Sequence, residues 1–350
     1  MRAMLAAYRA TGADPLFGDP RAAHGTPLEG YYWRFTDPAR EEVLVALCGV
    51  SRDREGHGWG TVALAHHPTG AVASASTPEA SADPGRLGAV AGDVLRGDAR
   101  RLHVDLGPDA GLEAELHDVV AWPHRAWGGV GLGHLVPGLS QYWLPWCLAA
   151  RVTGSARIGG RAVPLDGAVA YAEKNWGHGF PPDWWWGQAH GFGDDPEVCA
   201  AFAGGVLRVG PARPRATALV VRLGSRVLRR GEPVVNGVRA ELGDGSWRLR
   251  GGGIELVGSA AHDEGCVLPV PLPAERREVA GARQHLAGTI ELTVRRRGRL
   301  VYRGTSRLAG LERGRGLSSL APWPSQTPPS SPTSTPSSPA PSPRTSAPAT

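Results

Sequence analysis

The sequence predicts an all-β protein built from two consecutive antiparallel β-barrels or sheets, with little helix and a disordered C-terminal tail. Three observations lead to this prediction. The 49 glycines and 31 prolines divide the 350-residue chain into short runs. Many of these runs alternate apolar and polar residues with a period of two, as half-buried strands do. The end of the chain consists almost entirely of Pro, Ser and Thr, which cannot bury enough apolar surface to offset the entropy of ordering.

The N-terminal segment, residues 1–23, is an extension for which we expect at most a short helix. Its apolar run is broken by Tyr8, Arg9 and Asp14, so it lacks the core of a signal peptide and the length of a membrane span. The four cysteines are far apart and form no CxxC pair, which indicates reduced thiols, a cytoplasmic location and no zinc site.

Strands follow in order from about Gly30 to Gly310. Alternation is clear in residues 112–116 and 289–294, and turn dipeptides stand at Asp244-Gly245 and Arg297-Gly298. Residues 87–95 show helical spacing. Their glycines weaken this pattern, so a strand followed by a turn is an equally good interpretation. About fourteen short strands are too many for one small barrel, which favours two packed units. We place them at residues 24–160 and 161–316, divided in the turn-rich stretch 154–166, with the disordered tail at 317–350.

The charge of the chain argues against a nucleic-acid partner. The formal net charge is +5, and Lys174 is the only lysine among 38 basic residues. The cluster Arg295, Arg296 and Arg297 is interpreted as the solvated tip of a hairpin, since isolated charge runs usually face water.

The stretch YAEKNWGHGFPPDWWWGQ, residues 171–188, carries most of the candidate chemistry. In an extended strand Tyr171, Glu173 and Asn175 share one face, while Ala172, Lys174 and Trp176 share the other. A second strand from Trp184 to Gly191 would place Trp184, Trp186, Gln188 and His190 on one face. We expect the two strands to pair as a hairpin.

These tryptophans have two interpretations. Each one alone is as well explained by core packing. Together with Glu, Lys, Asn, Gln and His they would leave many buried polar groups without partners, whereas a cavity with a few convergent polar groups uses them. We therefore predict the wall of an aromatic pocket.

The stretch resembles tocopherol cyclase and its bacterial relatives, whose family carries a similar EKNWG, a glycine and FP turn, and a W-x-W-x-Q strand. Further similarity lies in EGYYWRF (residues 29–35), VPGLSQYW (136–143), FAGG (202–205), VPLP (270–273) and LAGLE (308–312). The resemblance spans residues 29–312. His178 replaces a glycine of the plant enzymes, and Tyr31 and Trp33 change the usual aromatic order.

The resemblance implies two lipocalin-like β-barrels, related to those of carotenoid hydratases, and an isomerase that closes a chroman ring. In the family reaction a prenylated hydroquinone's first side-chain double bond is protonated, and the phenol oxygen attacks the tertiary cation. No cofactor is consumed. The expected ligand is a prenylated quinol or another isoprenoid, with transient contact to a membrane surface.

This chemistry needs an acid, a dry pocket and a surface that stabilises the cation without trapping it. Glu173 is the first candidate acid, because burial among aromatic rings would keep it protonated. The alternatives are His178, His190, Asp183 and Glu29. The indoles of Trp176, Trp184, Trp185 and Trp186 are candidates for cation stabilisation, and Asn175 and Gln188 for holding the quinol hydroxyls. Further candidate binding residues are Tyr31, Trp33, Tyr171 and Lys174.

Other functions remain open at this point. Water attack on the same cation would make the protein an isoprenoid hydratase. Binding without reaction would make it a lipid carrier. A sugar platform is a weaker alternative, because glycoside hydrolysis requires two flanking carboxylates and only Glu173 with Asp183 is available. No P-loop pattern is present.

Overall fold

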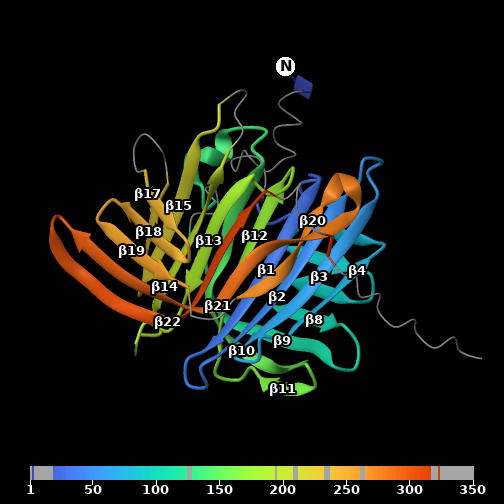
Figure 1. The fold of residues 1–350 in the computed structure, drawn as a ribbon, viewed down its shortest axis with the longest axis horizontal. Helices are drawn as coiled ribbons and strands as arrows, with labels where there is room; N and C mark the ends of the chain where they lie inside the picture. The colour runs from blue at the N-terminus through green and yellow to red at the C-terminus, as the bar shows by residue number, and fades with distance from the viewer. Residues whose placement is uncertain are drawn as a thin grey trace, which may run out of the picture.

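The computed structural model describes residues 2–3, 19–123, 128–193, 195–207, 212–231, 237–260, 265–316 and 322–323. It contains two large antiparallel sheets and two short 3₁₀ helices, so the predicted all-β fold of two consecutive sheets is confirmed (Figure 1). The described residues form 22 strands, more than the fourteen expected, because several predicted strands are split by turns. Arg2 and Ala3 are helical, and the rest of the N-terminal segment up to residue 18, like most of the predicted disordered tail, lies outside the described residues.

The first sheet has 12 strands, in the order β4-β3-β2-β1-β12-β10-β9-β8-β7-β6-β5, with β11 paired to β10. Its edge strands β5 and β6 contact β2 and β3, so the sheet curls toward closure. The strands are β1 (Leu28–Asp37), β2 (Glu42–Arg52), β3 (Gly58–His67), β4 (Val72–Thr77), β5 (Ala80–Ala82), β6 (Gly88–Ala91), β7 (Leu95–Asp98), β8 (Arg101–Asp105), β9 (Ala110–Ala121), β10 (Gln141–Ile158), β11 (Arg161–Pro164) and β12 (Val169–Gly177).

The second sheet has 10 strands, in the order β16-β15-β14-β13-β22-β21-β19-β18-β17, with β20 paired to β21. The 3₁₀ helices are η1 (Gly131–Leu135), before β10, and η2 (Pro273–Glu275), after β20. The strands are β13 (Asp183–Ala189), β14 (Val198–Val206), β15 (Arg215–Leu223), β16 (Arg226–Arg230), β17 (Arg239–Gly243), β18 (Ser246–Gly251), β19 (Ile254–Ser259), β20 (Cys266–Leu272), β21 (Arg277–Arg296) and β22 (Arg299–Arg315).

The division between the sheets differs from the predicted one. Residues 161–177, assigned from sequence to the second unit, form β11 and β12 of the first sheet. The turn-rich stretch 154–166 is therefore a hairpin inside that sheet, and the chain changes sheets between Gly177 and Asp183. The physical reason is that β12 fills the position between β1 and β10, a pairing that local turn signals do not specify.

The predicted hairpin of residues 171–191 is wrong for the same reason. β12 pairs with β1 and β10, while β13 pairs with β14 and β22, so the two aromatic strands belong to different sheets. Other local predictions are confirmed. Asp244-Gly245 joins β17 to β18, Arg297-Gly298 joins β21 to β22, and residues 87–95 contribute to β6 and β7 instead of a helix.

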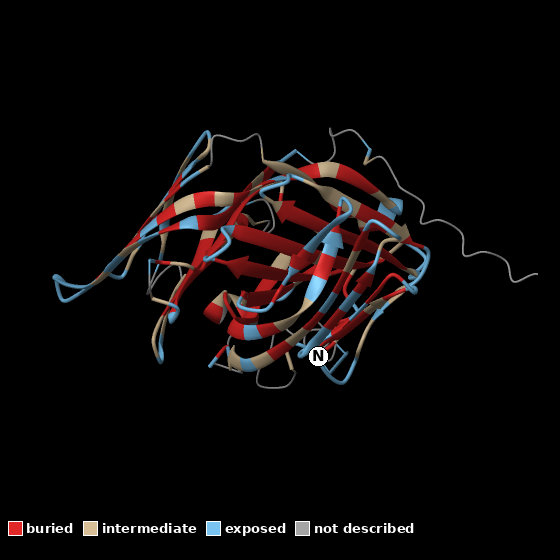
Figure 2. Ribbon diagram, turned by 90° about the horizontal axis from the view of Figure 1, so that it is seen from below, coloured by how far each residue is buried: buried red, intermediate tan, exposed pale blue. Residues whose placement is uncertain are grey.

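Buried residues concentrate where strands of the two sheets lie together, and exposed residues concentrate at hairpin ends (Figure 2). Hydrogen bonds join the sheets. The buried Arg34 on β1 donates from Nη2 to the carbonyls of Leu286 (2.6 Å) and Leu308 (2.7 Å) in the second sheet. Thr61 on β3 donates to Glu278 on β21 at 2.6 Å. The sheets therefore form a continuous packed body.

Two residues in the predicted tail are placed against this body. The backbone N–H of Trp323 donates to the Glu278 carbonyl (2.9 Å), and its indole N–H donates to Ser74 on β4 (2.9 Å). Here an aromatic residue interrupts the Pro/Ser/Thr composition, which supplies apolar surface that the rest of the segment lacks.

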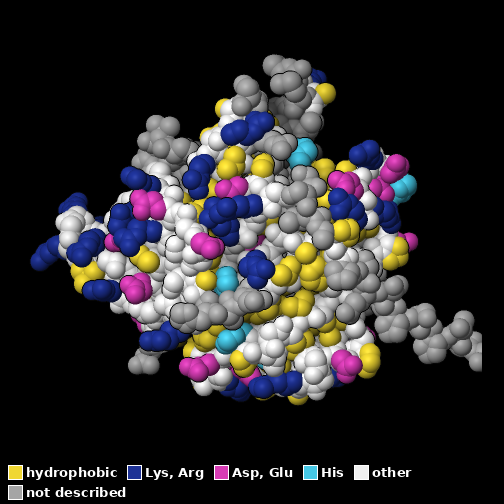
Figure 3. Space-filling view, viewed as in Figure 1, with side chains coloured by type: hydrophobic (Ala, Val, Ile, Leu, Met, Phe, Trp, Pro, Cys, Tyr) yellow, Lys and Arg dark blue, Asp and Glu magenta, His cyan; other side chains and the backbone are white. Residues whose placement is uncertain are grey.

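Arginine side chains gather over β17–β19 and the end of the β21–β22 hairpin (Figure 3). Arg295, Arg296 and Arg297 are exposed at that end, as predicted for a solvated hairpin tip. No helix in the described part of the chain has both the length and the apolarity needed to cross a bilayer.

Candidate functional site

A cavity of about 590 Å³ lies between the two sheets. The first sheet contributes residues of β1, β2, β3, β10 and β12, and the second contributes residues of β13, β14, β15, β20, β21 and β22. Most of the lining is apolar or aromatic. A mainly apolar cavity with a few polar side chains is typical of a small-molecule site.

Glu173 is one of these polar groups, and it is 4% exposed. Its Oε2 accepts hydrogen bonds from the Tyr171 hydroxyl (2.6 Å), the Trp143 indole N–H (2.8 Å) and the Trp186 indole N–H (2.9 Å). Trp186 comes from the second sheet and the other two donors from the first. The carboxyl group therefore sits where the sheets meet, and Oε1 lies outside this three-donor cluster.

Burial raises the pKa of Glu173 from 4.5 to about 7. The three donors stabilise the carboxylate and oppose the rise, while the nearby Glu312 carboxyl adds to it. About half of the molecules would therefore carry a protonated Glu173 at neutral pH, which suits a general acid.

Glu312 on β22 is a second buried carboxyl group that lines the cavity. Its Oε1 accepts a bond from the Trp184 indole N–H (2.6 Å), and its Oε2 accepts one from the Gln284 amide (2.8 Å). The Gln284 oxygen in turn accepts a hydrogen bond from the Tyr32 hydroxyl (3.0 Å). Burial raises the pKa of Glu312, against the effect of its two donors. Tyr32, Gln284 and Glu312 thus form a polar chain that crosses from the first sheet to the second.

The three consecutive tryptophans of β13 all line the cavity, although successive residues of a strand point to opposite faces. Each indole packs on a glycine of a neighbouring strand. A Cβ atom on Gly314 would lie 1.8 Å from the Trp184 ring, and one on Gly204 would lie 2.1 Å from the Trp185 ring. The glycines therefore leave the space that these aromatic rings occupy.

Asn175 also lines the cavity, on the face of β12 that carries Glu173. Its Oδ1 is buried and has no hydrogen-bond partner among the described residues. A buried acceptor of this kind is costly unless a ligand or water satisfies it. Asn175 is therefore the predicted binding residue whose placement best fits a ligand hydroxyl.

Lys174 lies on the opposite face of β12, as the alternation predicts, and does not neutralise Glu173. Its ammonium group donates to Glu29 Oε2 (2.9 Å) and to the Ala22 carbonyl (2.7 Å). Both side chains of this ion pair are fully buried. Burial lowers the pKa of Lys174, and the Glu29 carboxylate opposes that shift. The pair holds the N-terminal segment against the first sheet. The contacts of Glu29 and Lys174 therefore indicate a structural role.

Aromatic residues of the predicted site surround this ion pair. The Lys174 ammonium lies 5.1 Å from the Tyr31 ring centroid and 5.8 Å from that of Trp176. Tyr31 stacks with Trp33, and Trp176 stacks with His24. Of these predicted site residues only Tyr31 is among those that line the cavity. Trp176 is thus placed away from the cation that it was expected to stabilise.

Four other predicted residues lie outside the cavity lining. His178 is exposed after β12. His190 is buried and bonds the Leu148 carbonyl through Nε2 (2.9 Å), and burial lowers its pKa to about 4, which keeps it neutral. Gln188 contacts His190 through its amide at 3.3 Å. Asp183 faces Arg313 on β22, at 3.7 Å. None of them is placed to protonate a ligand bound beside Glu173.

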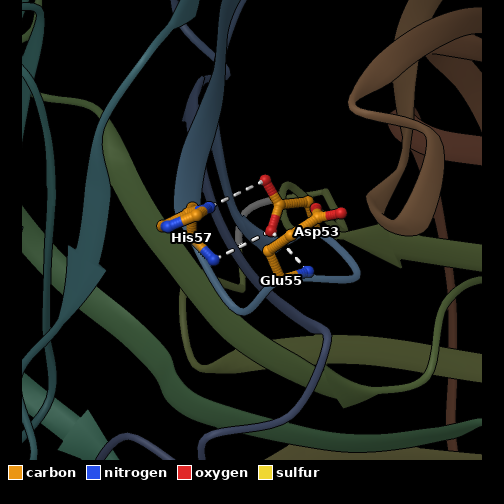
Figure 4. Close-up of side chains that lie close together, drawn as sticks. All are labelled: Asp53, Glu55 and His57. Atoms are coloured by element: carbon orange, nitrogen blue, oxygen red, sulfur yellow. Dashed lines mark hydrogen bonds and ion pairs between the residues drawn. The ribbon is translucent and has the colours of Figure 1, made fainter.

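A possible metal-ligating group lies elsewhere, in the turn between β2 and β3. Figure 4 shows Asp53, Glu55 and His57 close together. Asp53 Oδ1 accepts hydrogen bonds from the backbone N–H groups of Glu55 (3.1 Å) and His57 (2.8 Å), and Oδ2 accepts one from the Arg276 guanidinium (2.8 Å). These bonds explain the cluster as a turn that is fastened to the second sheet.

Part of the chain matches a known protein family. Residues 142–315 match the model of a family described as tocopherol cyclase-like. Over these residues the chain is tocopherol cyclase-like. The matched region supplies Trp143, Glu173, the tryptophans of β13, Gln284 and Glu312, whereas Tyr32 comes from β1, outside it.

Two plant relatives of this tocopherol cyclase-like chain match over shorter regions. It is 36% identical over 74 residues to a probable chloroplastic tocopherol cyclase of Oryza sativa subsp. japonica, over 21% of this chain and 13% of that protein. It is 35% identical over 77 residues to a chloroplastic tocopherol cyclase of Zea mays, over 22% of this chain and 14% of that protein. The matches thus span only a small part of these relatives.

The fold is shared at low sequence identity with a solved structure. The crystal structure of CghA with Sch210972 aligns with a TM-score of 0.51 and 12% identity, over 83% of this tocopherol cyclase-like chain and 89% of that one. Kievitone hydratase from Nectria haematococca aligns with a TM-score of 0.48 and 14% identity, over 82% and 89% of the two chains.

Sequence reasoning did not select four residues of this tocopherol cyclase-like chain that form the hydrogen-bond network of the cavity. Three of them lie inside the segments that carry the resemblance: Tyr32 in residues 29–35, Trp143 at the end of 136–143, and Glu312 at the end of 308–312. The family resemblance of these segments could therefore have pointed to these three residues. Gln284 lies in an ordinary alternating strand, and no local pattern distinguishes it.

Proposed function

We propose that this chain is an isomerase that closes a chroman ring on a prenylated hydroquinone, with Glu173 as the acid. The observation that carries the proposal is a buried carboxyl group with a pKa of about 7 in an apolar cavity lined by indoles. The match of residues 142–315 to the tocopherol cyclase-like family supports the reaction class.

The first step is protonation of the side-chain double bond. Glu173 gives its proton to the less substituted alkene carbon, a C–H bond forms, and the adjacent carbon becomes a tertiary cation. An alkene is a weak base, so the acid must be held close to it and water must be excluded. The apolar lining and the burial of Glu173 meet both needs.

The cation then needs stabilisation that does not trap it. The Trp184, Trp185 and Trp186 indoles border the same cavity. A desolvated cation over an indole face gains about 2 kcal/mol. The buried Trp143, held by its bond to Glu173, adds a fourth indole on the side of the first sheet.

Ring closure completes the reaction. The phenol oxygen attacks the tertiary carbon, a C–O bond forms, and the phenol proton leaves, so the product has the same composition as the substrate. Asn175, with its unpartnered Oδ1 in the cavity lining, is proposed to hold a quinol hydroxyl. Gln188, outside that lining, has no part in this proposal.

The test is to incubate the purified protein with a panel of prenylated hydroquinones. The expected product has the mass of the substrate and a shifted retention time. Glu173→Gln should lower its rate of formation at least about 100-fold, the usual contribution of a general acid. Glu278→Gln, an equally buried carboxyl outside this cavity, is the matched control and should keep the rate.

Other outcomes would replace the proposal. A product heavier by one water would identify a hydratase. Tight binding with the substrate recovered unchanged would identify a lipid carrier. Full activity of Glu173→Gln would show that another group supplies the proton.

A further inference from the structure

The cavity holds two carboxyl groups, and the proposed reaction has so far used only one. We infer that Glu312 is the catalytic base that takes the phenol proton during ring closure. This inference rests on the proposed function. It assigns opposite protonation states to Glu173 and Glu312, from the hydrogen bonds that each receives.

Both oxygens of Glu312 are occupied as acceptors. Trp184 donates to Oε1 at 2.6 Å, and Gln284 donates to Oε2 at 2.8 Å. An indole N–H can only donate, so Oε1 must accept. A carboxyl that accepts at both oxygens fits the ionised form.

Tyr32 bonds the other end of the Gln284 amide. Its hydroxyl donates to the Gln284 oxygen at 3.0 Å, and the Gln284 NH₂ group donates to Glu312. Burial raises the pKa of Tyr32, so the hydroxyl keeps its proton. Tyr32 and Gln284 are thus positioning residues that hold Glu312 ready to accept a proton.

Glu173 has the opposite pattern. All three of its donors converge on Oε2. Oε1 lies outside this donor cluster, so it can carry the acidic proton while Oε2 keeps its three bonds. Among the described residues, Glu173 thus has one oxygen outside its donor cluster that can hold a proton, whereas both oxygens of Glu312 accept hydrogen bonds.

The two groups are also coupled through the cavity. Glu312 is among the charges that raise the pKa of Glu173. A negative charge on Glu312 makes ionisation of Glu173 more costly, so an ionised Glu312 favours the protonated form of Glu173. One neutral and one ionised carboxyl is the resting state that an acid–base reaction needs.

The proton balance of the cycle then closes. Glu173 gives its proton to the alkene carbon, and the phenol oxygen attacks the cation. The phenol proton passes to the Glu312 carboxylate as the C–O bond forms. At the end Glu173 is ionised and Glu312 is protonated, and proton exchange with solvent after product release restores the starting state.

Infrared difference spectroscopy across pH tests the proton distribution without any substrate. The band of a buried protonated carboxyl should be present in the wild-type protein at neutral pH, and Glu173→Gln should remove it. Glu312→Gln should keep the band, with its loss on titration shifted to lower pH because a neighbouring negative charge is gone. A band that survives in Glu173→Gln and disappears in Glu312→Gln would overturn the assignment.

Turnover in D₂O tests the role in ring closure. The wild-type product should contain one deuterium at the carbon protonated by Glu173. Glu312→Gln should lower product formation at least about 100-fold. Because alkene protonation remains intact in this variant, the recovered substrate should still gain deuterium at its side-chain double bond.

The remaining outcomes separate this inference from the proposed function. Ring closure at the wild-type rate in Glu312→Gln would refute Glu312 as the base. Loss of both exchange and closure would also refute it, since Glu312 would then act in the protonation step. Absence of product and exchange in the wild-type protein would refute the proposed function, while the infrared result would still decide which carboxyl holds the proton.

Discussion

Replacing Glu173 by Gln should change how the stability of the protein depends on pH. The carboxyl has a pKa of about 7 when folded, compared with 4.5 for an unperturbed group. The folded state therefore binds this proton more tightly than the unfolded state. Its contribution to stability is fully present below pH 4.5 and is lost as the pH rises through 7.

The size of this contribution follows from the shift. One pKa unit corresponds to about 1.4 kcal/mol, so the free energy of unfolding should fall by about 2 to 3 kcal/mol between about pH 5 and 8. The group is fully buried, so solvent screening does not reduce this figure. In Glu173→Gln the neutral amide removes the ionisation, and this part of the pH dependence should disappear.

Urea unfolding at several pH values measures the effect, in the wild-type protein and in Glu173→Gln. Taking the difference between the two proteins removes the contributions of other titrating groups. Glu278→Gln is the control for replacing a buried carboxyl by an amide elsewhere in the protein. Parallel curves for the wild-type protein and Glu173→Gln would refute the reasoning, because they would show that folding does not favour the protonated form of Glu173.

Three further predictions concern activity and packing. The kcat/KM of the wild-type protein should fall as the pH rises through about 7, where the cavity acid loses its proton, and a profile that rises through this range would exclude that acid. Lys174→Met should lower the free energy of unfolding by about 3 kcal/mol, because the buried Glu29 carboxylate loses its ammonium partner and keeps Arg52, at 3.6 Å, as its cationic contact. Adding Glu29→Gln should restore part of the loss in urea unfolding, and the folded fraction should keep its rate, because the pair lies on the far face of β12. Gly314→Ala should displace the Trp184 ring and lower the free energy of unfolding by about 1 to 3 kcal/mol. It should also weaken the binding of a prenylated quinol, as measured by calorimetry. Gly85→Ala, with no atom nearer than 3.5 Å to the new Cβ, should leave binding unchanged.

Local sequence signals succeeded where the structure depends on local geometry. The period of two placed Glu173 and Asn175 on one face of β12 and Lys174 on the other, because side chains alternate in any strand. The turns at Asp244-Gly245 and Arg297-Gly298 were found for a similar reason, since glycine readily adopts the backbone angles that these turns require.

The predicted aromatic hairpin failed because strand pairing is not local. β12 and β13 are separated by a short turn, and proximity in sequence favours a hairpin. Each strand instead fills a gap between distant strands, β12 between β1 and β10, and β13 between β14 and β22. The histidines were misplaced for a related reason, since His178 and His190 lie outside the cavity that the two sheets enclose.

The sequence by itself determined the all-β class, the two-sheet organisation, the aromatic stretch and Glu173 as the first candidate acid. Composition, alternation and motif are properties of short segments, so the sequence was sufficient for these. Only the tertiary structure decided that the cavity lies between the sheets and that Glu173 and Glu312 share it. Glu312 is 128 residues from its donor Trp184, and Gln284 is 252 residues from Tyr32. Such contacts form only when both sheets pack, because neither partner specifies the other within its own segment.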